Sequence, residues 1–262
     1  MTHYPFPDSR GTKIAFAAFF TAMLFLARDS MFTTAVIGFE KAQFLMLGVI
    51  CLLGVAFLIA NRRNLLQILK DRRMIVAGIA AAVLLLPMLV KRDWQLMYFS
   101  VLLCLLTGVF LSYFLTLRDA AKYYVAILSV LGAYSVLAAY ILRIGVDSGA
   151  YAVPVFQNSM GFEFHNFFLS IVPDTYVKNR NFGIFREPGV YQFFLITALH
   201  LNNYEVEWKR LWQLWLVIGI LAATMVSTFA TGGVAEMGLL AIVLFFERNG
   251  IGTSGYVPWR SG

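Results

Sequence analysis

Five long stretches of this chain contain no Lys, Arg, Asp or Glu, and each is long enough to cross a lipid bilayer as a helix. A bilayer core of about 30 Å needs about 20 mostly apolar residues per helix, and the backbone amides must be paired within the segment. The five stretches are Ala42–Ala60, Met74–Val90, Trp94–Leu117, Tyr123–Leu142 and Leu211–Ala230. Only 13% of the residues are charged, against about 25% in soluble domains. The sequence therefore predicts an integral membrane protein.

Three weaker apolar stretches raise the expected number of spans to about eight. They are Ile14–Ala27, Pro188–Tyr204 and Val234–Phe246. The predicted fold is an all-α, polytopic bundle of transmembrane helices that forms a single membrane domain over residues 1–262. One long outer loop is expected at 143–187, and a disordered tail at 249–262.

The basic residues predict the orientation of the bundle. With the N-terminus in the cytoplasm, thirteen of the 21 Lys and Arg fall in inner segments, with the densest group at 62–73. Short cytoplasmic loops carry this excess in membrane proteins. We therefore expect a multi-pass protein of the cell membrane, and we interpret the basic group as a topology signal beside anionic lipid, not as a nucleic-acid site.

The long outer loop is rich in aromatic residues, so we expect it to pack over the outer end of the bundle. Loops longer than about 12–15 residues are usually functional or disordered. We expect a short surface helix at 161–172. His165 lies in this region and is interpreted either as a proton carrier or as a polar residue at an interface.

The end of this loop has the features of an anion site. Pro188 is favoured in the first turn of a helix, whose N-terminus carries a partial positive charge. Arg180 and Arg186 precede it, and Gly183 and Gly189 permit close backbone approach. Guanidinium groups beside a helix N-terminus suit a phosphate, and at a membrane surface a natural anion is the diphosphate of a lipid.

The same residues have simpler interpretations. The two arginines are either functional or are solvated and paired with acids such as Asp174 and Glu187. Glu187 is a candidate to orient an arginine or to act on a hydroxyl. No metal-ligand cluster is evident in the sequence, and neither a metal nor a cofactor is expected.

A second polar segment, Ser227–Glu236, is expected at the same outer face. Its Ser, Thr and Gly residues favour tight helix packing. Glu236 falls one turn into the last helix, where a carboxylate usually faces protein or a cavity. It is interpreted either as a partner of Arg180 or Arg186 or as a packing feature of the helix end.

The segment Arg180-x-x-Gly183-Ile184-Phe185-Arg186-Glu187-Pro188-Gly189 resembles the signature region of the O-antigen polymerase and O-antigen ligase superfamily. The continuation Val190-Tyr191-Gln192 is most similar to polymerases of exopolysaccharides and capsules. The resemblance is specific over residues 179–192 and looser over 227–233.

This resemblance implies a GT-C-like membrane glycosyltransferase at the outer face of the bacterial inner membrane. Such enzymes polymerise glycan repeat units carried on undecaprenyl diphosphate and need no metal. By position Arg180, Arg186 and Glu187 would be catalytic. The remaining residues would bind the diphosphate or glycan: Gly183, Gly189, Tyr191, Gln192, His165 and Glu236. The implied partners are the lipid-linked glycan, membrane lipid, a flippase and a chain-length regulator, and no nucleic acid.

Three alternatives to a polymerase remain open. The chain is also compatible with an O-antigen ligase, or with a transporter or flippase of an anionic lipid-linked substrate. Members of the superfamily continue with further helices and a second large outer loop. We therefore expect the chain to be a truncated member or a fragment, and an inactive remnant is the third alternative.

Overall fold

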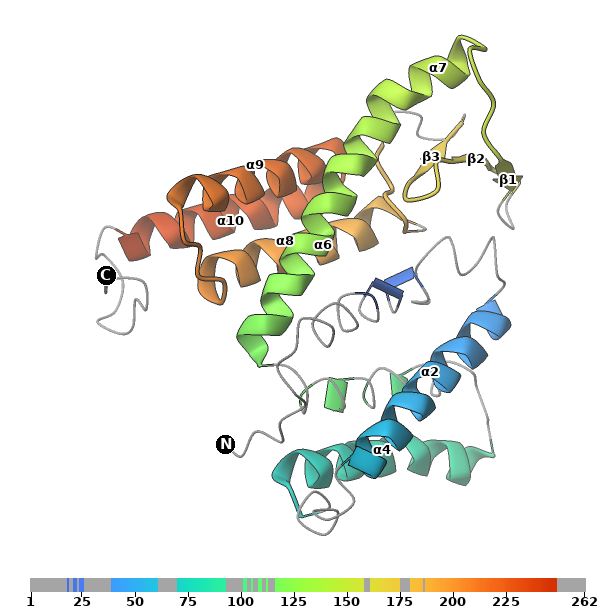
Figure 1. Cartoon of the computed structure of the whole chain (residues 1–262), viewed down its shortest axis with the longest axis vertical. Helices are drawn as coiled ribbons and strands as arrows, with labels where there is room; N and C mark the ends of the chain where they lie inside the picture. Colours follow the sequence, from blue (N-terminus) through green and yellow to red (C-terminus); the bar gives the residue numbers. More distant parts are fainter. Residues whose placement is uncertain are drawn as a thin grey trace. The chain divides into compact units, whose positions relative to one another are not determined.

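The structure is a computed structural model, and it is mostly helical (Figure 1). It describes residues 18, 21–22, 24–25, 39–60, 70–92, 101–102, 105, 108–109, 112, 116–157, 161–174, 180–185 and 187–248. The chain divides into two compact units, one from Met1–Arg28 with Val36–Leu117 and one from Asp29–Ala35 with Arg118–Gly262. The predicted tail at 249–262 and most of the predicted first span lie outside the described residues. The single membrane domain stays a prediction.

The first unit contains helices α2 (Phe39–Ala60) and α4 (Arg72–Lys91). Asp71 caps α4, because its carboxylate accepts a hydrogen bond from the Arg73 amide at 2.8 Å. The Arg73 guanidinium also donates to this carboxylate and forms an ion pair with it at 3.1 Å. These contacts hold the pKa of the Asp71 carboxyl below its ordinary value. A capping side chain of this kind satisfies an amide that the helix leaves unpaired.

The described part of the second unit contains four long helical segments (Figure 1). The first is a continuous rod in which α6 (Leu117–Leu137) passes through a π-helical segment, η3 (Ala138–Leu142), into α7 (Arg143–Asp147). The others are α8 (Pro188–Tyr204), α9 (Leu211–Ser227) and α10 (Thr231–Arg248). The predicted helix start at Pro188 is confirmed. The rod extends to Asp147, so helix replaces the first residues of the predicted loop.

The helices of the second unit pack closely where small residues allow it. Helix α8 contacts both α9 and α10, which also contact each other. Gly132 of α6 faces Thr224 of α9 so closely that an added Cβ would lie 2.7 Å from the Thr224 hydroxyl oxygen. Both residues are buried. This is the close approach through small residues that is typical of helices in membranes.

The aromatic loop forms a small sheet, so the predicted surface helix at 161–172 is wrong. Strands β1 (Val155–Gln157), β2 (Glu163–Asn166) and β3 (Ile171–Pro173) pair antiparallel in the order β1-β2-β3. Phe164 is buried against Ile171 and Phe182, whereas its neighbours in β2 are half-buried. Pairing of side chains across neighbouring strands stabilises a sheet of this kind.

Among the described residues, two helical segments are long and apolar enough to cross a membrane: Arg72–Val90, with a mean hydropathy of 2.3, and Leu117–Asp147, with 2.2. In the most apolar part of each segment, only 11% and 39% of the residues, respectively, are buried within the protein. An apolar helix in the core of a soluble protein would be buried on most sides. Two shorter apolar helices are Leu211–Ser227 and Thr231–Phe246. The bundle of eight spans, the inner membrane and the orientation stay predictions.

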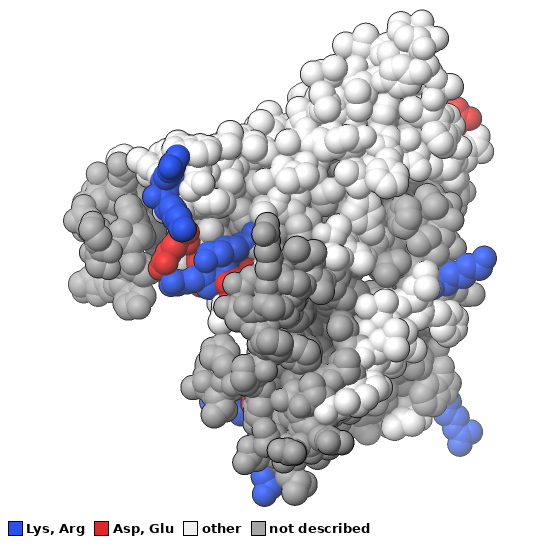
Figure 2. Space-filling model, viewed as in Figure 1, with Lys and Arg blue, Asp and Glu red and all other residues white. Residues whose placement is uncertain are grey.

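Charged side chains gather at one end of the second unit, where α6 begins and the α8–α9 turn lies (Figure 2). Arg118 and Glu207 form an exposed ion pair at 2.8 Å there. Lys122, Lys209 and Arg210 are exposed in the same two segments. We call these five residues the charged end. It unites two segments that the basic-residue pattern predicts to lie on the cytoplasmic side.

The contact between α6 and α9 predicts that alanine substitutions at two glycines differ in their effect on stability. Gly132→Ala should destabilise the protein by about 1–3 kcal/mol, because Thr224 must move to admit the methyl group. Gly219→Ala is the matched control, since nothing lies within 4 Å of a Cβ added at Gly219 of α9. The control should be neutral or slightly stabilising. Thermal unfolding in detergent measures both, and equal melting temperatures would contradict the packing.

Candidate functional site

Asn181 fixes the end of the loop to two helices. Its side-chain nitrogen donates to the hydroxyls of Ser135 in α6 at 2.8 Å and Ser227 in α9 at 2.9 Å. Its side-chain oxygen accepts from the Gly183 amide at 2.9 Å, and its own amide donates to the Ser227 carbonyl at 3.0 Å. Asn181 is only 1% exposed. Buried polar groups need such partners, so this amide determines where the neighbouring Arg180 lies.

Gly183 and Tyr191 form the inner side of the same anchor. Gly183 has a φ of 55°, and an added Cβ would lie 2.6 Å from the Tyr191 ring. The Tyr191 hydroxyl is 3.1 Å from the Ser135 hydroxyl, and its ring packs on Phe185. Because Tyr191 is 1% exposed, it supports the anchor from within the protein. Neither residue lines the pocket described below.

Gln192 joins the start of α8 to the start of α10. Its side-chain nitrogen donates to the Thr228 hydroxyl at 2.8 Å and the Ala230 carbonyl at 2.5 Å. Its oxygen accepts from the Gly233 amide at 2.7 Å. A Cβ at Gly233 would lie 2.4 Å from the Gln192 side-chain carbon, so the contact requires glycine. This one buried amide therefore holds the two helix N-termini side by side.

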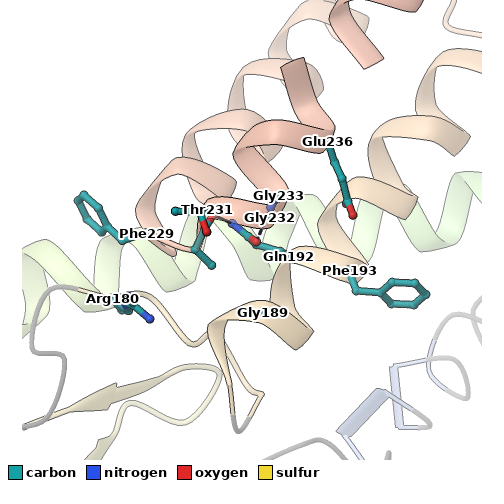
Figure 3. A pocket seen from close by; sticks show the side chains of 10 residues that line it. Arg180, Gly189, Gln192, Phe193, Phe229, Thr231, Gly232, Gly233 and Glu236 are labelled. Carbon is teal, nitrogen blue, oxygen red and sulfur yellow. Dashed lines mark hydrogen bonds between the residues drawn. The ribbon is translucent and has the colours of Figure 1, made fainter. Parts of the chain in front are cut away.

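A pocket of about 350 Å³ lies between the loop and these two helices (Figure 3). Its lining consists of Arg180 from the loop, residues from α8, residues from α10 and the turn that precedes α10. The lining residues are Arg180, Gly189, Gln192, Phe193, Phe229, Ala230, Thr231, Gly232, Gly233 and Glu236. Four residues predicted from the sequence, Arg180, Gly189, Gln192 and Glu236, are thus brought together.

The charges around this pocket favour a bound anion, and the protein also places a carboxylate, a proton and hydrogen-bond acceptor, in the pocket. Helices α8 and α10 both begin at the pocket, and each N-terminus carries roughly half a positive charge. The guanidinium of Arg180 adds a full charge and forked donors. Glu236 contributes a carboxylate from the second turn of α10, and within the described part of the chain no ion pair joins it to Arg180.

The other predicted site residues lie elsewhere. Glu187 is the exposed N-cap residue of α8 and has an extended backbone. His165 lies in β2, where its Nε2 is 3.3 Å from the Asp174 carboxylate, and it does not line the pocket. Arg186 lies outside the described residues. Among the residues that the structure does describe, no group of three potential metal ligands occurs.

Sequence reasoning missed two kinds of residue. Asn181 is not among the predicted site residues, because an asparagine between an arginine and a phenylalanine in a loop forms no recognisable pattern. Phe229 and Phe193 are pocket residues that the apolar pattern hides, because any lipid-facing position can hold phenylalanine. The Ser227–Thr228 segment was expected to pack, and its hydroxyls do so through the hydrogen bonds to Asn181 and Gln192.

Comparison of the chain with protein-family models, curated proteins and solved structures finds no match.

The Gln192 bridge predicts that two adjacent glycines differ. Gly233→Ala should displace the Gln192 side chain and lower stability by about 1–3 kcal/mol, because a methyl group there overlaps the amide. Gly232→Ala should cost less, since a Cβ at Gly232 has nothing within 4 Å. Thermal unfolding and hydrogen exchange in the first turn of α10 measure the difference. Equal exchange in the two variants would rule out the bridge.

Proposed function

We propose that this chain is a membrane glycosyltransferase that transfers glycan repeat units from undecaprenyl diphosphate to a growing polysaccharide, as an O-antigen, capsule or exopolysaccharide polymerase. The observation that carries this proposal is the convergence of Arg180 with the N-termini of α8 and α10 on one pocket. Helix N-termini and arginine both bind phosphate oxygens, and together they suit a diphosphate. The resemblance of residues 179–192 to polymerase signatures supports the same chemistry.

The proposed reaction is the one that the resemblance implies, and the charges around the pocket suit it. An acceptor hydroxyl attacks the anomeric carbon of the donor sugar, and the bond from that carbon to the diphosphate oxygen breaks. Negative charge then develops on the leaving diphosphate, where Arg180 and the two helix termini would stabilise it. The hydroxyl proton needs an acceptor, and we assign this role to Glu236, the carboxylate that lines the pocket.

The distribution of charge within the second unit supports a pocket at the outer face. The pocket lies where α8 and α10 begin and α9 ends, whereas the charged end lies where α8 ends and α9 begins. Basic residues favour the cytoplasm, so the opposite end of these helices would face outward. A site at the end of the helices suits a lipid head group, whereas transporter sites lie near the bilayer midplane.

Replacement of Arg180 tests the function directly. In cells whose only copy of the gene encodes Arg180→Ala, polymer formation should fall by about 100-fold or more, since a donor to the developing charge is lost. Single lipid-linked repeat units should accumulate. Arg180→Lys should retain part of the activity, because lysine keeps the charge without the forked donors. Electrophoresis of the lipid-linked glycans measures the outcome.

The matched control is Arg210→Ala, which removes one exposed arginine from the charged end. It should leave polymer length unchanged at the same protein abundance. Arg186→Ala tests the second arginine of the sequence motif in the same assay. Normal polymer from Arg180→Ala at normal abundance would contradict the proposal.

Cysteine labelling tests the orientation independently. With both native cysteines replaced, Ser148→Cys at the end of α7 should react with an impermeant maleimide from the outer side. Lys209→Cys at the charged end should react only after the membrane is permeabilised. Both positions are exposed, so accessibility depends on the side of the membrane. The reverse pattern would place the pocket in the cytoplasm.

A further inference from the structure

Phe229 holds a backbone conformation that phenylalanine rarely adopts. Its φ is 48°, directly after Thr228, the C-cap residue of α9. A helix commonly ends with a left-handed residue at this position, and that residue is usually glycine because a side chain costs energy there. The α9–α10 turn, residues 228–230, contains no glycine, and the next glycines, Gly232 and Gly233, lie in the first turn of α10. A turn selected for stability alone would favour glycine at position 229.

The ring of Phe229 lies on the rim of the pocket. It is 55% exposed and belongs to the same pocket as Arg180. Figure 3 shows the ring extending away from the polar centre, on the opposite side from Phe193. Strained residues concentrate at functional sites, where the surrounding structure holds them. Here the Gln192 side chain fixes the next residue by its hydrogen bond to the Ala230 carbonyl.

The two aromatic residues lie at different depths along the helices. Phe229 is in the turn between α9 and α10, level with the helix ends that would hold the diphosphate. Phe193 is the sixth residue of α8, roughly 7 Å along the helix from Pro188. If the helix ends face water, Phe193 lies on the lipid side of the diphosphate, whereas Phe229 lies beside the diphosphate and nearer to the water than Phe193.

We infer that Phe229 contacts the sugar that is joined to the diphosphate, and this inference rests on the proposed glycosyltransferase function. A lipid-linked glycan leaves the diphosphate in two directions, with the prenyl chain entering the bilayer and the sugars entering water. Phe229 is the ring nearer to the water, so it is the one placed to meet the first sugar, whose C–H-rich face packs on an aromatic surface. Pockets of this kind combine aromatic walls with a few polar groups that set orientation.

Phe229→Gly separates substrate contact from stability. The substitution removes the ring and also relieves the left-handed backbone, so the melting temperature should remain near the wild-type value or rise. Affinity should be measured on the full chain in nanodiscs for two lipids. One is undecaprenyl diphosphate carrying a single repeat unit, purified from cells that lack this gene, and the other is undecaprenyl diphosphate alone.

The variant should bind the glycosylated lipid roughly five- to tenfold more weakly than the wild type, the loss expected for one aromatic contact. Its affinity for undecaprenyl diphosphate alone should not change. Phe229→Tyr keeps the ring and should restore binding. Phe168→Gly is the matched control, because Phe168 also has a positive φ, of 69°, and is 78% exposed but lies outside the pocket. The control should bind both lipids normally.

Two results would overturn the inference. Unchanged binding of both lipids by Phe229→Gly would show that the ring contacts no substrate. An equal loss for both lipids would assign the ring to the prenyl chain or the diphosphate. If the wild-type protein binds neither lipid, the proposed function itself fails, and that result is distinct from the other two.

Discussion

The second unit depends on one buried amide, the side chain of Asn181. Its hydrogen bonds join the loop to α6 through Ser135 and to α9 through Ser227. A buried amide without partners would be costly, so the loop and the two helices must come together in one arrangement. That arrangement places Arg180, the preceding residue, beside the start of α10. The position of the Arg180 guanidinium is thus a consequence of the buried hydrogen bonds of the next residue, Asn181.

At the other wall of the pocket, the buried side-chain amide of Gln192 forms a similar set of hydrogen bonds. It joins the start of α8 to Gly233 at the start of α10, so two positive helix ends share one space. Two such ends repel each other weakly, and a bound anion would relieve that repulsion. Both amides lie at the end of the helices that is remote from the charged end. The second unit is therefore polarised along its helices, with the charged end at one side and, at the other, the pocket that we propose binds an anion.

Much of this architecture could be predicted from hydrophobicity and helix signals, because both are local. The apolar stretches 42–60, 74–90, 123–142, 188–204 and 234–246 lie within described helices, and α8 begins at Pro188, as the preference of proline for the first helical turn predicts. The sheet could not be predicted in the same way, because its strands are short and depend on pairing across the loop. Gly183 was predicted to approach a ligand, yet its close neighbour is Tyr191. Contacts between residues distant in sequence decide such cases, and a single sequence does not display them.

The most direct test of the account is an experimental structure of the full chain in a nanodisc with undecaprenyl diphosphate bound. We expect the diphosphate beside Arg180 and the first turns of α8 and α10, with the prenyl chain running past Phe193. Phosphate oxygens should lie at hydrogen-bond distance, about 2.7–3.2 Å, from the Arg180 guanidinium. A diphosphate bound at the charged end, or a pocket without it at saturating lipid, would contradict the central claim that these two helix ends and Arg180 form a diphosphate site.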